Sequence, residues 1–113
     1  MAFFHLRLQP PRPTFPFDGT PEEMTAMARH ADYWRAQAKT GVAIVVGPVF
    51  EGEGAWGMAV IEVADESAAH QIADNDPIVQ APFGFRFIVS PIRSLIMREP
   101  QTSPEQQAQL KAG

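Results

Sequence analysis

The stretch VAIVVGPVFEGEGAWGMAVIEV, residues 42–63, predicts two strands joined by a tight hairpin. The first strand begins at Val42, is rich in β-branched residues and is expected to end near Gly47-Pro48. The second strand runs from Ala55 to Val63, and the glycines of residues 51–54 supply the turn. Both strands carry apolar residues at odd and even positions, which is typical of strands covered on both faces.

A strand and a proline-rich loop open the chain. Residues 3–8 alternate between two faces, with Phe4, Leu6 and Leu8 on one face and His5 and Arg7 on the other. Four prolines between residues 9 and 19 remove backbone donors, so neither a helix nor a central strand continues there. The two phenylalanines of this loop, Phe15 and Phe17, are expected either to dock over a cleft as a lid or to lie exposed.

A capped helix connects this loop to the hairpin. Thr20-Pro21-Glu22-Glu23 has the pattern of a capping box with proline at the first helical position. Lys39 and Gly41 are typical of a helix end, so the helix is predicted from Pro21 to about Thr40. Its apolar residues recur at three- and four-residue spacing: Met24, Met27, Ala28, Ala31, Trp34 and Ala38.

The remaining elements complete a βαββαβ order, which is an α+β arrangement. Asp65 is predicted to cap a second helix that runs to about Ala73, and Phe85–Ile92 forms the last strand. We therefore expect one domain over residues 1–93. Residues 94–113 form a C-terminal extension with an apolar triplet, Leu95-Ile96-Met97, and a second capping-box pattern at residues 103–106. So short a helix is not stable alone, so this extension is expected either to dock on a partner subunit or to stay frayed.

The composition excludes several classes of protein. With 45% hydrophobic and 19% charged residues the chain is globular rather than disordered. A formal net charge of −4 without a basic cluster argues against nucleic-acid binding. No apolar run is long enough to span a membrane, so a cytoplasmic location is expected. The absence of cysteine excludes disulfides and thiolate ligands. The three histidines, at 5, 30 and 70, lack metal-ligand spacing, and neither a metal nor a cofactor is expected.

The strand pattern predicts a homodimer. Two helices on crossover connections cover one face of a four-stranded antiparallel sheet, yet several strands are apolar on both faces. At roughly 25 cal/mol per Å², several hundred Å² of wet apolar surface would cost on the order of 10 kcal/mol, which is comparable to the stability of a small domain. A second copy of the chain covers this apolar surface when the two sheets pair face to face. His5 and Arg7 then point between the subunits, either as dimer contacts or as ligand partners.

Three sequence features, in this order, resemble the YciI-like (YCII-related) proteins. They are the segment Arg29-His30-Ala31-Asp32-Tyr33-Trp34, the pair Gly47-Pro48, and the pair Asp76-Pro77. The resemblance covers residues 3 to about 92. It implies a ferredoxin-like fold, with a four-stranded antiparallel sheet and two helices on one face, that assembles into a dimeric α+β barrel. It also implies that His30 and Asp76 form the active-site pair.

The chemistry of these two residues fits that role, and a structural interpretation stays open beside it. Imidazole titrates near neutral pH, so His30 can act as general base and acid, with the Asp76 carboxylate fixing its tautomer. Equally, a histidine near Trp34 on a helix can be a packing residue. An aspartate before proline is also an ordinary cap for a turn over residues 77–80.

These observations lead to two hypotheses for function. The first is a small, cofactor-independent, lyase-type enzyme that uses the His30–Asp76 pair for elimination or isomerisation of a small organic molecule. Substrate contacts are then expected from His5, Arg7 and Trp34, with His5 or Arg7 meeting an anionic or phenolic oxygen. The alternative is a non-catalytic dimeric module that binds a small molecule or serves as a scaffold.

Overall fold

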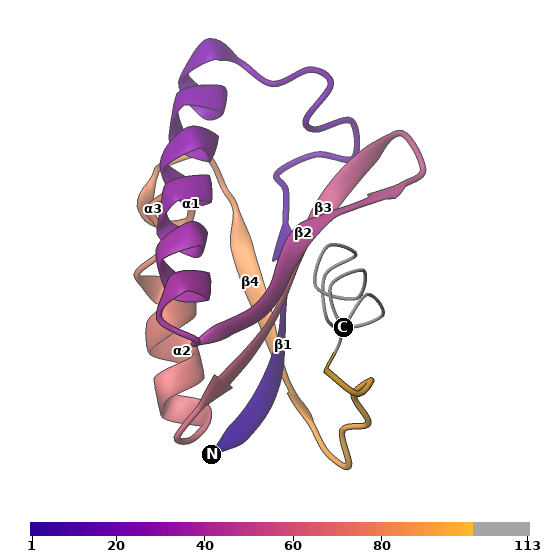
Figure 1. Ribbon diagram of the computed structural model, residues 1–113. Coiled ribbons are helices and arrows are strands. Elements are labelled where there is room, and N and C mark those ends of the chain that lie inside the picture. Colours follow the sequence, from indigo (N-terminus) through magenta and orange to yellow (C-terminus); the bar gives the residue numbers. More distant parts are fainter. Residues whose placement is uncertain (101–113) are drawn as a thin grey trace, which may run out of the picture.

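The computed structural model describes residues 1–100, and its centre is a four-stranded antiparallel sheet (Figure 1). The strand order is β2-β3-β1-β4. This order, with helices on one face, confirms the predicted ferredoxin-like α+β fold. The elements in chain order are β1 (Ala2–Gln9), α1 (Pro21–Lys39), β2 (Ala43–Glu51), β3 (Gly54–Val63), α2 (Glu66–Asp74), α3 (Pro77–Gln80) and β4 (Arg86–Ile92).

Helix α1 begins at the predicted capping box. The Thr20 hydroxyl accepts the Glu23 backbone N–H at 3.1 Å, and the Glu23 carboxylate accepts the Thr20 N–H at 2.9 Å. The predicted apolar stripe is only partly buried. Trp34 is 3% exposed, whereas Met24 is 44% exposed. Met27, Ala31 and Ala38 line a cavity, and Met27 also packs against the core. Part of the stripe therefore faces an open space.

Strand β2 is longer than the sequence predicted. It passes through Gly47-Pro48 and ends at Glu51, with Pro48 opposite Gly57 of β3. The prediction was wrong at this end because β2 is an edge strand, where a proline removes no hydrogen bond on the unpaired side. The turn that follows uses Gly52 at φ +62°, a backbone conformation that favours glycine.

The loop before α1 is part of the core. Phe15 is 3% exposed, and its ring meets the Phe85 ring edge-on at 4.9 Å between centroids. The Ala55 N–H donates to the Phe15 carbonyl at 2.9 Å, which joins the loop to the start of β3. Phe17, by contrast, is 73% exposed. Phe17 thus adopts the exposed alternative, whereas Phe15 is packed in the core, and a lid function of the loop stays a prediction.

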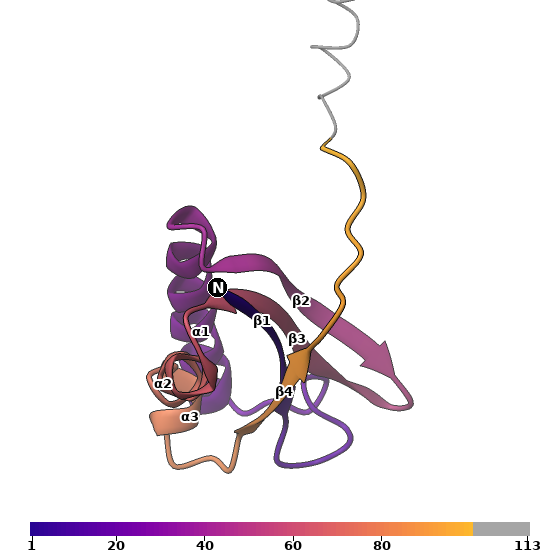
Figure 2. The same cartoon turned by 90° about the horizontal axis from the view of Figure 1, so that it is seen from below.

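The two sides of the sheet differ in cover. Helices α1, α2 and α3 all lie on one side, and no helix of residues 1–100 lies on the other (Figure 2). Buried Phe4, Leu6 and Leu8 of β1 face the helices, so the intervening residues face the uncovered side. Apolar side chains lie there too, including Met58 and Val60 of β3 and Ile88 of β4, which is 39% exposed.

The chain leaves the sheet after β4 as an extended segment. Within it Ile96 is 95% exposed and Met97 is 56% exposed. The helix predicted around residues 103–106 lies outside the described residues. Of the helices within residues 1–100, none has both the length and the apolar character needed to span a bilayer.

Candidate active site

A cavity of about 650 Å³ lies between helix α1 and the hairpin of β2 and β3. Its walls are mostly apolar, because the inner side of the hairpin and one side of α1 carry aliphatic and aromatic residues. Such walls, with few polar groups, are typical of small-molecule sites. The lining from α1 comprises Met27, His30, Ala31, Trp34, Arg35 and Ala38, and residues 44–48 of β2 form the opposite wall.

His30 and Asp76 meet beside this cavity. The His30 Nδ1 atom lies 2.6 Å from Asp76 Oδ2. The same oxygen accepts the Trp34 indole N–H at 2.7 Å, since His30 and Trp34 are one turn apart on α1. The other oxygen, Oδ1, accepts the Ile78 backbone N–H at 3.0 Å. Asp76 is 0% exposed, so these hydrogen bonds replace the water that a buried carboxylate has lost.

The contact with Asp76 favours one tautomer of the neutral His30 ring. Because Nδ1 faces the carboxylate, the neutral ring carries its proton there and leaves the lone pair of Nε2 free. Nε2 has no hydrogen-bond partner among the described residues, and the ring lines the cavity. Asp76 also fulfils the structural interpretation, because its Oδ1 caps the first turn of α3. The cap uses Oδ1, whereas His30 lies against Oδ2, and the catalytic role of the pair stays a prediction.

Tyr33 holds the neighbouring part of the helical layer. Its hydroxyl donates to the Ile72 carbonyl of α2 at 2.7 Å. Burial, and then the negative charge of Asp76, raise the pKa of the Tyr33 hydroxyl. Tyr33 is therefore a neutral donor at neutral pH, and it fixes α1 against α2 directly beside His30.

The five predicted site residues fall into two groups. His30, Asp76 and Trp34 come together, and Trp34 lines the cavity while donating to Asp76. His5 and Arg7 lie on the uncovered side of the sheet, so one protomer does not bring them to His30. The Arg7 guanidinium stacks 4.0 Å above the Trp56 ring and lies 3.6 Å from Glu51. Their contact with a ligand stays a prediction.

A second polar cluster, which the sequence did not predict, fixes the loop before α1. The Arg12 guanidinium donates to both oxygens of Glu23, at 2.8 and 2.6 Å, and to Asp18 at 3.0 Å. The Arg12 side chain lowers the pKa of Glu23 to about 2, with help from the Thr20 backbone N–H. Glu23 in turn raises the pKa of Arg12, and the Thr14 hydroxyl lowers the pKa of Asp18. We call Arg12 and Glu23 the loop clamp.

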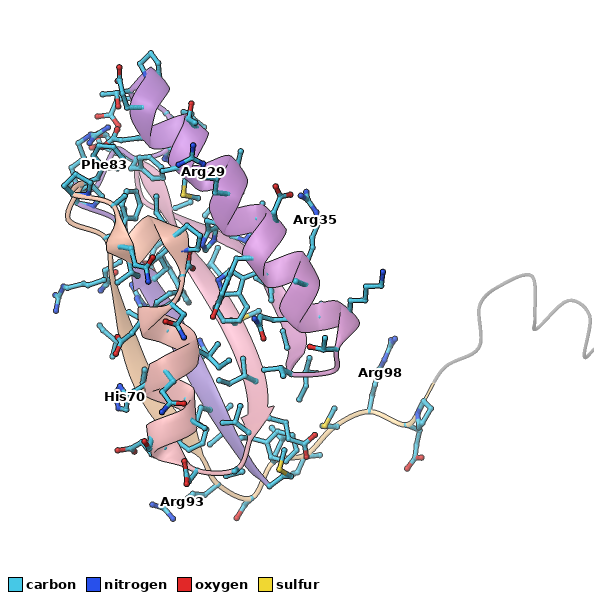
Figure 3. The ribbon with its side chains drawn as sticks, turned by 90° about the vertical axis from the view of Figure 1, so that its left-hand side faces the viewer. Arg29, Arg35, His70, Phe83, Arg93 and Arg98 are labelled. Atoms are coloured by element: carbon cyan, nitrogen blue, oxygen red, sulfur yellow. The ribbon has the colours of Figure 1, made fainter. Side chains whose placement is uncertain are left out.

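The capping box was the available signal for the loop clamp. It predicted Glu23 at the third helical position, but Arg12 lies in a loop whose path follows from no sequence periodicity. Elsewhere, His70 of α2 lies 3.9 Å from Glu66 and projects from the opposite side of the helical layer from Arg35 (Figure 3). Within residues 1–100, no group of three or more histidine, aspartate or glutamate side chains is arranged to hold a metal ion.

The fold and the site together define a small ferredoxin-like α+β protein in which a half-buried histidine meets a buried aspartate beside a cavity. The chain belongs to the YCII-related domain family, whose family model matches residues 3–93. No curated protein matches the chain. Among solved structures it is similar to 5-chloro-2-hydroxyhydroquinone dehydrochlorinase from Burkholderia phenoliruptrix, in complex with 2,5-dihydroxybenzoquinone. The TM-score is 0.53 and the identity 18%, over 80% of this chain and 93% of that one. At this identity the likeness shows the fold.

Proposed function

We propose that this protein is a small-molecule enzyme in which His30 is the general base and acid of an elimination or isomerisation. One observation carries the proposal. The His30 ring lines an apolar cavity and is held at 2.6 Å by a fully buried carboxylate. A base in such a place meets a substrate away from bulk water, where its interactions are stronger.

The proposed step needs no group beyond the chain and its substrate. His30 Nε2 takes a proton from an acidic carbon or oxygen of the substrate, and the electron pair left behind forms a new double bond. In an elimination the leaving group departs with its bonding pair. In an isomerisation the imidazolium returns the proton at another atom. Asp76 stabilises the imidazolium in between through the Nδ1 hydrogen bond.

The substrate that best suits the cavity is a small, flat, weakly acidic organic molecule. The walls supply apolar contacts from Trp34, Phe85 and Phe87. The structural relative is named for loss of hydrogen chloride from a ring compound, and it was solved with a flat quinone bound. Both facts favour an aromatic or quinone-like substrate for this chain.

We also propose that the working unit is a homodimer paired through the uncovered side of the sheet. Apolar side chains on that side, among them Met58, Val60 and Ile88, lie beside Trp56 and Arg7. Burying several hundred Å² of them is worth on the order of 10 kcal/mol at roughly 25 cal/mol per Å². His5 and Arg7 then contact the second copy.

The catalytic role is tested by His30→Ala. Compounds of the proposed class are first screened for binding by thermal shift and then for proton loss and release of a leaving group. The variant is expected to lower the rate by about 10² to 10⁴. His70→Ala, on the exposed side of α2, is the matched control and keeps the wild-type rate. Activity that survives His30→Ala contradicts the assignment.

The competing function is a binding module without chemistry. The observation that favours a binding module is the cap that Asp76 forms on α3. The contact between His30 and Asp76 would then serve only to hold α1 against α3. In that case wild-type protein binds the same compounds without turning them over. His30→Ala would then lower only stability and affinity.

The homodimer is tested by sedimentation over a range of dilutions. Ile88→Asp places a charge on the uncovered side and is expected to give a smaller species, whereas Gln71→Asp on the exposed side of α2 leaves the wild-type mass unchanged. A wild-type protein that is monomeric and fully folded at every concentration contradicts the homodimer.

A further inference from the structure

Two N–H groups converge on one oxygen of Asp76. The Oδ2 atom lies 2.6 Å from His30 Nδ1 and 2.7 Å from Trp34 Nε1. The indole of Trp34 is 3% exposed and packs edge-on against the Tyr33 and Phe87 rings, at 5.6 and 6.0 Å between centroids. Its N–H is therefore held in place by the core and does not depend on the cavity being occupied.

We infer that Trp34 is a positioning residue that controls the basicity of His30 through Asp76. An indole N–H and a backbone N–H only donate, so Trp34 and Ile78 together hold both oxygens of Asp76 as acceptors. Both N–H groups bond more strongly to the oxygens of an ionised carboxylate than to those of a protonated carboxyl, so they favour the ionised form. The proton shared with His30 therefore stays on Nδ1, and Nε2 keeps its lone pair for the cavity.

The second consequence concerns charge. The Trp34 N–H takes part of the negative charge of Oδ2, so the carboxylate stabilises the imidazolium less than an unshared one would. This sharing of charge favours the neutral ring, which is the state a general base needs. The link to catalysis rests on the proposed function, but the effect of Trp34 on His30 does not.

Few other ionisable groups face the His30 ring. From α1 they are Tyr33, whose hydroxyl donates to Ile72, and Arg35, which pairs with Asp32 at 3.1 Å with both side chains more than 75% exposed. Such an exposed pair is strongly screened. The described cavity residues of β2, β3 and β4 carry no ionisable side chain. Asp76 is therefore the dominant charge near His30. Trp34 is the core side chain that donates a hydrogen bond to Asp76.

Trp34→Phe tests this inference, because phenylalanine keeps an aromatic ring and deletes the N–H. The His30 ring is titrated by NMR in the wild type and the variant. The pH at which half of the rings are protonated is expected to rise by about 0.5 to 1 pH unit. Trp56→Phe is the matched control, since the Trp56 Nε1 atom has no hydrogen-bond partner in the described part of the chain. It leaves the His30 midpoint unchanged.

A measurement on the wild-type chain covers the case in which Trp34→Phe does not fold. The indole N–H resonance of Trp34 is expected to move as His30 titrates, and this movement is lost in His30→Ala. The inference is overturned if the Trp34 resonance does not move as His30 titrates. It is also overturned if Trp34→Phe changes the protonation midpoint of His30 by less than about 0.2 pH unit. Neither measurement uses a substrate, so an enzyme that shows no turnover would remove the proposed function and leave this result standing.

Discussion

The two buried acidic side chains of residues 1–100, Glu23 and Asp76, are 5% and 0% exposed and have opposite kinds of partner. Glu23 meets the guanidinium of Arg12, whose charge is permanent and whose side chain is one-third exposed. Asp76 meets the imidazole of His30, a side chain that can both donate and accept a proton. Both carboxylates also accept backbone N–H groups at the start of a helix.

Under the proposed function, this difference separates a structural contact from the site of proton transfer. The loop clamp satisfies every charge in a single state, so it can fix the loop against α1 but cannot transfer a proton. The His30–Asp76 pair has two protonation states and one ring nitrogen on the cavity side. A buried carboxylate thus indicates chemistry only when its partner is titratable and reaches a space where a ligand fits.

Among the variants that test the comparison of Glu23 with Asp76, Asp76→Ala is expected to have the largest effect on stability. The change leaves the N–H groups of Trp34 and Ile78 buried without acceptors and breaks the bond to His30. The free energy of unfolding should fall by about 3 to 5 kcal/mol, measured by urea denaturation. Asp74→Ala, two residues earlier on an exposed position, should change it by less than about 0.5 kcal/mol. Equal losses would show that burial of Asp76 has no special energetic role.

An intermediate effect is expected where the clamped loop meets the hairpin. A Cβ atom on Gly54 would lie 2.2 Å from the Pro13 carbonyl oxygen and 2.4 Å from that of Phe15, so Gly54→Ala must displace the loop. We expect a loss of about 1 to 3 kcal/mol in the free energy of unfolding. Gly47→Ala is the control, because a Cβ there meets nothing within 4 Å. A neutral Gly54→Ala would mean that the loop is not fixed against β3.

The smallest effect is a pH dependence of the loop clamp. The pKa of Glu23 falls from 4.5 to about 2 on folding, because Arg12 favours the ionised form. A lowered pKa in the folded state adds stability above the ordinary value, and this stability is lost as the pH falls from 4.5 to about 2. The difference in unfolding free energy between the wild type and Glu23→Gln should shrink across that window. Glu22→Gln, its exposed neighbour, is the control. A difference that stays constant would contradict the clamp.

Much of the fold follows from local rules in the sequence. The capping box set the start of α1, the alternation of residues 3–8 set the faces of β1, and Asp65 capped α2 as predicted. These signals depend on neighbours a few residues apart, which is why they can be read from the chain alone. The end of β2 could not be predicted from the chain alone. A proline is acceptable within that strand only when the strand lies at a sheet edge.

For the site, the sequence by itself determined the residue types and the helical spacing that put His30 and Trp34 one turn apart. Only the tertiary structure decided that Asp76, 46 residues beyond His30 in the chain, would lie 2.6 Å from its ring and share an oxygen with Trp34. The physical reason is that hydrogen bonds between distant segments depend on how whole elements pack, and no local periodicity records that packing.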